Sequence, residues 1–86
     1  MASITASPNP FNPSVFIRLD RSQLKEKDKV KMMVFDVRGK MIKDLTVQFE
    51  HTDHAIWNAE TMASGIYLLR MQAGQQSFIR KITLIR

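Results

Sequence analysis

Apolar and polar residues alternate along most of this chain with a period of two, while the 3.6-residue periodicity of an amphipathic helix is nearly absent. In the segment VFIRLD, one face carries Val15, Ile17 and Leu19. Because successive side chains of a strand point to opposite faces, this alternation predicts strands that each bury one face. Comparable runs occupy residues 30–37, 39–47, 54–59, 65–71 and 77–85.

Turn signals separate these runs and define the expected architecture. Gly39 in DVRGK and Gly74 in QAGQQ each lie between two strand-like segments, where glycine can supply a positive φ, so both predict hairpins. The polar stretch 21–29 is expected to be a loop between strands. Strand spacings of about 10 to 12 residues are typical of a two-sheet sandwich. The sequence therefore predicts an all-β, immunoglobulin-like (fibronectin III-like) antiparallel β-sandwich of about seven strands.

The sandwich is expected to occupy residues 7–86, with residues 1–6 a lead-in or the remnant of an excision from a longer chain. The residues expected in or near its core are Val15, Ile17, Val30, Met32, Val34, Ile42, Leu45, Trp57, Tyr67, Leu69, Ile82 and Leu84.

All three prolines lie within the eight residues SPNPFNPS, positions 7–14. Proline fixes φ and has no N–H, so it is confined to sheet edges and to the first residues of strands. We expect this segment to be a stiff ribbon at the first edge of the fold, placing Phe11 in the core. The side chains of Asn9 and Asn12 are expected to cap nearby backbone groups in Asx-turns.

Composition excludes several classes of protein. The 86 residues contain no cysteine, which excludes disulfides and cysteine-ligated zinc, and no run approaches the ~20 apolar residues that a membrane-spanning helix needs. The opening MASITAS lacks the charged leader and apolar stretch of a signal peptide. The net charge of +5 is spread along the chain, and acidic residues interrupt the only local cluster of cations, at 25–31. Solvated strand faces explain this pattern, so no nucleic-acid partner is expected.

The segment EHTDH is the only cluster that suggests metal binding or catalysis. On a strand, His51 and Asp53 would share one face and His54 would point away. Two ligands do not complete a tetrahedral site, so a solvated loop is favoured and neither a metal nor a cofactor is expected.

Other catalytic patterns are no better supported. Glu50 and Glu60 form no carboxylate pair that a short sandwich would hold across a sugar, and Ser22 and Ser64 have no evident histidine partner. No enzyme activity is expected.

The two large polar aromatic residues have two interpretations. If Trp57 and Tyr67 were exposed, they would suggest a platform that binds carbohydrate. A lone tryptophan in a small sandwich more often fills the core, and Tyr67 follows Gly65 like a tyrosine whose hydroxyl tethers a loop. The core interpretation is favoured for both.

Four segments, SPNPFNPS, VFDVRGKMI, MASGIYLLRM and RKITLIR, occur in this order over residues 7–86. In this order they resemble the C-terminal sorting domain of the type IX (Por) secretion system, an immunoglobulin-like sandwich. They are equally similar to the related sandwich module of flagellar hook-capping proteins and many bacterial surface hydrolases. The positions that the resemblance marks as a sorting motif are Pro8, Asn9, Pro10, Gly39, Gly65, Tyr67, Lys81 and Arg86.

The resemblance implies that residues 7–86 are the non-catalytic C-terminal module of a larger exported protein. Its partners would be the outer-membrane secretion machinery and the upstream cargo domains of the same chain, and its location the cell surface or the exterior, reached through the periplasm. A receptor could pair with the terminal strand, residues 78–85, by β-augmentation. Two alternatives are an accessory module that binds carbohydrate or the cell surface for a secreted hydrolase, with polysaccharide as its partner, and a hook-cap-like assembly domain.

Overall fold

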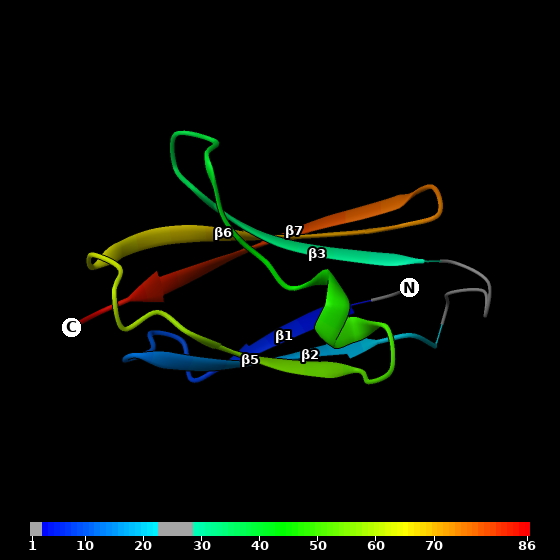
Figure 1. Cartoon of the computed structure of the whole chain (residues 1–86), viewed down its shortest axis with the longest axis horizontal. Coiled ribbons are helices and arrows are strands. Elements are labelled where there is room, and N and C mark those ends of the chain that lie inside the picture. Colours follow the sequence, from blue (N-terminus) through cyan, green and yellow to red (C-terminus); the bar gives the residue numbers. More distant parts are fainter. Residues whose placement is uncertain (1–2, 23–28) are drawn as a thin grey trace.

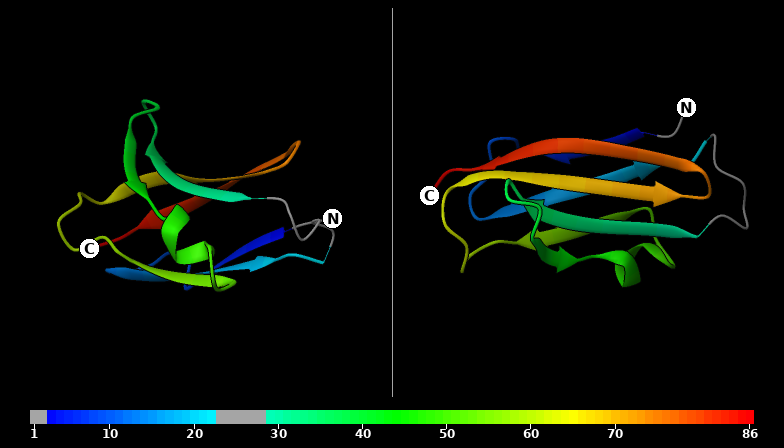
Figure 2. Two further views of the ribbon diagram at one scale, coloured as in Figure 1. Left: turned by 45° about the vertical axis from the view of Figure 1, so that its right-hand side comes forward. Right: turned by 90° about the horizontal axis from the view of Figure 1, so that it is seen from above.

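The computed structural model of the protein describes residues 3–22 and 29–86 and forms two antiparallel sheets packed face to face (Figure 1). One sheet has the order β1-β2-β5 and the other β4-β3-β6-β7. Figure 2 shows the sheets as two layers with the core between them. The predicted sandwich with about seven strands is confirmed. The elements are β1 (Ser3–Ser7), β2 (Ser14–Asp20), β3 (Val30–Asp36), β4 (Met41–Asp44), the 3-10 helix η1 (Thr46–Phe49), β5 (His54–Asn58), β6 (Gly65–Ala73) and β7 (Gln76–Leu84).

The core is built from the inward faces that the alternation predicts. Buried and exposed side chains alternate strictly along β2, from Val15 to Asp20, and along the second half of β6, from Leu69 to Ala73. Every residue expected in the core is buried except Ile42, which is partly buried and packs against it. No polar or charged side chain is buried in the described part of the chain, so hydrophobic burial dominates the stability of the fold.

The amino-terminal part of the fold differs from the expectation in two ways. β1 begins at Ser3, so most of it lies within residues 1–6, the stretch expected to be a lead-in or remnant, and its residue Ile4 is fully buried. Consequently, the proline segment is not the first edge of the fold: it connects β1 to β2, which pair in antiparallel register from Ser3↔Asp20 to Ser7↔Phe16. The strand was missed because SITAS has only two apolar side chains and ordinary loop residues around them.

The run at 39–47 also ends earlier than its alternation predicts. A side-chain oxygen of Asp44 accepts a hydrogen bond from the backbone N of Thr46 at 2.9 Å, and the Thr46 hydroxyl accepts one from the backbone N of Met32 at 3.1 Å. These side-chain bonds replace ladder bonds and turn the chain into η1, which buries Phe49.

Both predicted hairpins are present. Gly39 has φ +88° and Gly74 has φ +58°. A Cβ at Gly39 would meet no atom within 4 Å, so the backbone conformation, rather than space, requires glycine there. The loop expected at 21–29 lies mostly outside the described residues.

Two phenylalanines provide a matched test of the core. Phe11 is 1% exposed, as predicted, whereas Phe16 on the outer face of β2 is 41% exposed. We expect Phe11→Ala to lower the free energy of unfolding by about 3–5 kcal/mol, the loss typical of a buried phenylalanine. Phe16→Ala should cost less than about 1 kcal/mol. Urea unfolding of both variants measures the difference, and equal losses would contradict the placement of Phe11.

Candidate recognition site

The proline segment lies along the outer edge of β7. The side chain of Asn9 pairs with that edge as a peptide group would: Nδ2 donates to the carbonyl of Lys81 at 3.2 Å, and Oδ1 accepts from the backbone N of Thr83 at 3.0 Å. This arrangement replaces the local Asx-turn that was expected of Asn9. The Asn12 side chain is exposed and makes no hydrogen bond within the described residues.

Phe11 continues the pairing through its backbone. Its N donates to the carbonyl of Thr83 at 2.9 Å, and its carbonyl accepts from the N of Ile85 at 3.0 Å. Phe11 thereby forms a parallel bridge opposite Leu84. The edge of β7 is therefore covered from Lys81 to Ile85, and the expectation of an open edge along the whole terminal strand is wrong for this half.

Three aromatic rings pack against one another in the core beneath the paired edge. The ring of Phe11 lies 5.7 Å from that of Trp57, and Trp57 meets Tyr67 edge to face at 5.5 Å. All three residues are buried, which confirms the core interpretation of Trp57 and Tyr67. The Tyr67 hydroxyl donates to the carbonyl of Ala63 at 2.6 Å, so it tethers the connection between β5 and β6 as predicted.

Arg86 binds the connection between β5 and β6 from its solvent-exposed side. Its backbone N donates to the Ser64 hydroxyl at 3.0 Å, and its guanidinium donates to the carbonyls of Met62, at 2.7 Å, and of Glu60. On the other side of the connection, the N of Ala59 donates to the carbonyl of Pro13 at 2.9 Å. The chain terminus, the connection 59–64 and the proline segment thus lie at one end of the sandwich (Figure 1). We call this the motif end, formed by residues 8–13, 59–67 and 81–86.

Seven of the eight residues marked in the sequence meet at the motif end. Pro8, Asn9 and Pro10 are exposed beside Lys81 at the edge of β7. Gly65, with φ +156°, begins β6 opposite Leu84, next to Tyr67 and Arg86. Gly39 does not join them: it lies in the turn between β3 and β4 and lines a hollow over the four-stranded sheet with Ile79 of β7. Sequence reasoning missed Ser64 and Ala59, whose contacts depend on residues more than 20 positions away.

One family profile, described as the secretion system C-terminal sorting domain, matches residues 6–85. The chain belongs to this family of type IX sorting domains. Such domains are non-catalytic signals that direct export through the periplasm to the cell surface or the exterior, which implies the secretion machinery as a partner. No curated protein matches the chain. Among the described residues of this sorting domain, no helix is long and apolar enough to cross a membrane.

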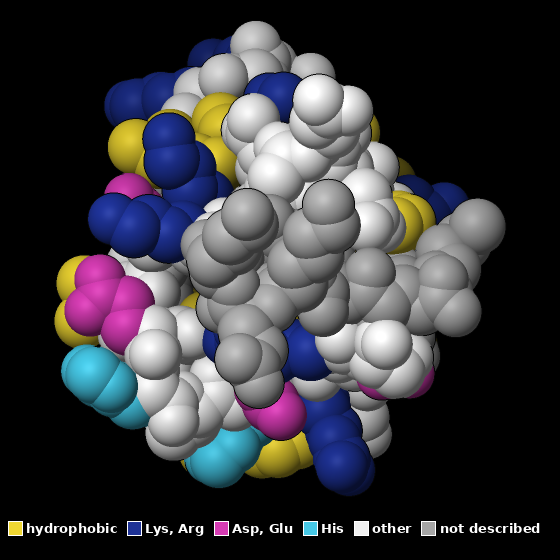
Figure 3. Space-filling model, turned by 90° about the vertical axis from the view of Figure 1, so that its right-hand side faces the viewer, with side chains coloured by type: hydrophobic (Ala, Val, Ile, Leu, Met, Phe, Trp, Pro, Cys, Tyr) yellow, Lys and Arg dark blue, Asp and Glu magenta, His cyan; other side chains and the backbone are white. Residues whose placement is uncertain are grey.

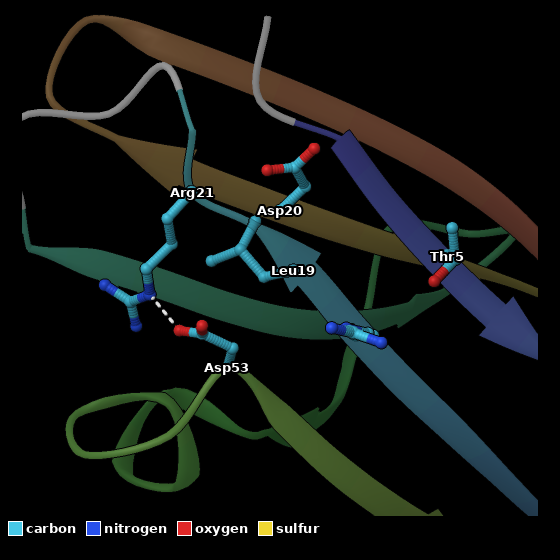
Figure 4. Close-up of a pocket in the computed structure, with 6 residues that line it drawn as sticks. Thr5, Leu19, Asp20, Arg21 and Asp53 are labelled. Atoms are coloured by element: carbon cyan, nitrogen blue, oxygen red, sulfur yellow. Dashed lines mark hydrogen bonds and ion pairs between the residues drawn. The ribbon is translucent and has the colours of Figure 1, made fainter.

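The EHTDH segment of the sorting domain is a turn leading into β5. Asp53 forms an ion pair with Arg21 at 2.5 Å beside an open hollow of about 480 Å³ (Figure 4), and the His54 ring stacks on Phe16 at 5.5 Å. Within 3–22 and 29–86, no group of three or more potential ligands could hold a metal ion. These contacts account for Asp53 and His54 structurally.

On the face drawn in Figure 3, charge is dispersed. In the end-on view of Figure 3, Lys and Arg side chains lie in several places with acidic side chains between them. Two carboxyl groups are tuned by local hydrogen bonds: the backbone N of Ser22 lowers the pKa of Asp20, and the side chain and backbone of Thr46 lower the pKa of Asp44. Both belong to turns away from the motif end and indicate no proton chemistry there.

The two asparagines of the proline segment offer a matched test of the covered edge. We expect Asn9→Ala to lower the free energy of unfolding by about 1–2 kcal/mol, because it removes two hydrogen bonds, and to speed exchange of the Thr83 amide proton. Asn12→Ala should leave both quantities near those of the native domain. Hydrogen exchange followed by NMR measures the effect, and indistinguishable behaviour of the two variants would refute the pairing.

Proposed function

We propose that the secretion machinery recognises this sorting domain at the motif end. The observation that supports this is the convergence of three separate segments, 8–13, 59–67 and 81–86, through direct hydrogen bonds: Asn9 with β7, Ala59 with Pro13, and Arg86 with the connection 59–64. A signal that accompanies unrelated cargo has to lie in the surface of the domain itself. A surface assembled from separate segments exists only after folding. A receptor that binds this surface would therefore bind the folded domain and not the unfolded chain.

The residues of the motif end divide into two groups by burial. Phe11 and Tyr67 are buried, and we assign them the role of holding the surface in shape. Pro8, Pro10 and Lys81 are exposed. The Lys81 side chain makes no hydrogen bond or ion pair with any described residue, so its ammonium group is available to a partner. We assign these exposed residues the role of direct contact.

We further propose that the domain acts without catalysis and that cargo domains of the same exported protein lie upstream. The family is non-catalytic, and three of the polar residues considered for chemistry have structural contacts: Asp53 pairs with Arg21, His54 stacks on Phe16, and Ser64 accepts a hydrogen bond from Arg86. The alternative of a polysaccharide-binding module depended on an exposed aromatic platform. Trp57 and Tyr67 are in the core, which leaves that alternative without its supporting residues.

Two lysines test the proposal. A reporter fused ahead of residues 1–86 should reach the surface of a host with type IX machinery, and Lys81→Ala should reduce surface delivery several-fold without changing stability. Lys43→Ala, at an exposed position on the opposite edge strand, should deliver normally. Surface labelling of the reporter against total reporter measures delivery. Failure of the native fusion to reach the surface would refute the proposal, and equal effects of the two variants would remove Lys81 from the contact surface.

A further inference from the structure

The outer edge of β7 is covered along only half of its length. The pairing of β6 with β7 runs without a bulge from Gly65↔Leu84 to Ala73↔Gln76, so backbone groups alternate regularly between the two edges of β7. Because Lys81, Thr83 and Ile85 point outward to residues 9–11, Ser77 and Ile79 also point outward. Within 3–22 and 29–86, no residue pairs with the outward N–H and C=O groups of Ser77 and Ile79. We call residues 77–80 the open edge.

A hollow of about 540 Å³ adjoins the open edge on its inner side. Its walls come from β1, through Ile4, Thr5 and Ala6, and from β7, through residues 79–81, with Asn9 at one end. Arg80 lines the hollow, and its Nε donates to the carbonyl of Ile4 at 3.2 Å. Asn9 lines the hollow and covers the edge of β7 at Lys81. A strand added along residues 77–80 would therefore end beside Asn9.

On its outer side, the open edge presents an exposed apolar side chain. Ile79 is 62% exposed and lines an apolar hollow of about 220 Å³ over the four-stranded sheet, together with Phe35, Gly39, Leu68 and Arg70. Among the residues that the structure describes, no acidic one lines either hollow. Apart from the neutral polar residues Thr5 and Asn9, the side chains that an added strand would meet there are apolar or cationic.

We propose that the open edge receives one extended segment of the secretion machinery as an added strand. Its backbone would pair with Ser77 and Ile79. Because side chains directly opposite each other in paired strands are neighbours, it would place an apolar side chain beside Ile79 and carboxylates beside Arg80 and Lys81. The proposal rests on the function proposed above. It adds the chemistry of the partner at the open edge, which adjoins the motif end.

Charge argues against a second copy of this chain as the occupant. Antiparallel self-pairing centred on Ile79 would make the Arg80 side chains of the two copies diagonal neighbours on one face of the ladder, where long side chains reach each other. The like charges of these two residues weaken self-pairing. An acidic and apolar segment from another protein removes this repulsion and contributes attraction instead.

Proline at position 79 separates backbone pairing from side-chain contact. Ile79→Pro removes the outward N–H but no β6–β7 ladder bond, because the N–H of Ile79 points away from β6. We expect it to lower surface delivery of the fused reporter about tenfold, the loss expected for an unpaired backbone hydrogen bond. Ile79→Ala, which keeps the backbone donor, should lower delivery less than Ile79→Pro does, because it reduces only the apolar contact. Ser77→Pro removes the other outward donor and replaces Ile79→Pro if that variant does not fold, as checked by circular dichroism and thermal unfolding.

Each result has a distinct meaning. Normal delivery of the folded proline variants, or equal losses for Ile79→Pro and Ile79→Ala, would overturn strand addition and leave the proposed function intact. Failure of the native fusion would instead refute the proposed function. Sedimentation of the native domain as a dimer that Ile79→Pro converts to a monomer would assign the open edge to a second copy and overturn the proposal.

Discussion

The pairing of the proline segment with β7 is the interaction on which the rest of the motif end depends. A sandwich of two separate sheets leaves edge strands at its sides, and each presents unpaired backbone groups. Asn9 and Phe11 satisfy these groups on β7 from Lys81 to Ile85. The same segment sends the Phe11 ring inward to Trp57, so edge protection and core packing are achieved by adjacent residues.

This coupling explains why the residues proposed as a sorting motif and the folding determinants overlap. Tyr67 packs against Trp57 and also tethers the connection between β5 and β6, to which Arg86 binds from outside. Loss of either residue would disturb both the fold and the exposed surface. Effects on export at these positions therefore do not separate recognition from stability. Exposed positions without internal partners, such as Lys81, do separate them.

Much of the fold follows from local patterns in the sequence. Alternation predicts the inward faces of β2, β3, β6 and β7, and the need for positive φ predicts the turns at Gly39 and Gly74. These features depend on a few neighbouring residues. β1 could not be predicted in this way because its pairing with β2, rather than its own composition, defines it as a strand.

The candidate site was predictable only in part. The family resemblance selected residues that meet at the motif end, with Gly39 as the exception. The bonds that assemble this end join positions 22 to 74 residues apart, and an asparagine between two prolines carries no sign that its amide will substitute for a peptide group on a distant strand. The division of β7 into a covered and an open half depends on where that asparagine falls along the strand.

The half-open edge of β7 reconciles two opposing requirements of a sorting tag. Exposed backbone groups favour strand addition by a receptor but also favour aggregation of the exported protein. Arg80 lies at a position facing the other sheet yet stays exposed, and Lys81 follows it on the outer face. Inward-pointing and edge cations are established protection against pairing between identical copies. The same two charges attract a segment that carries carboxylates. Specificity at this edge thus arises from repulsion of like partners and attraction of unlike ones, with a backbone ladder common to both.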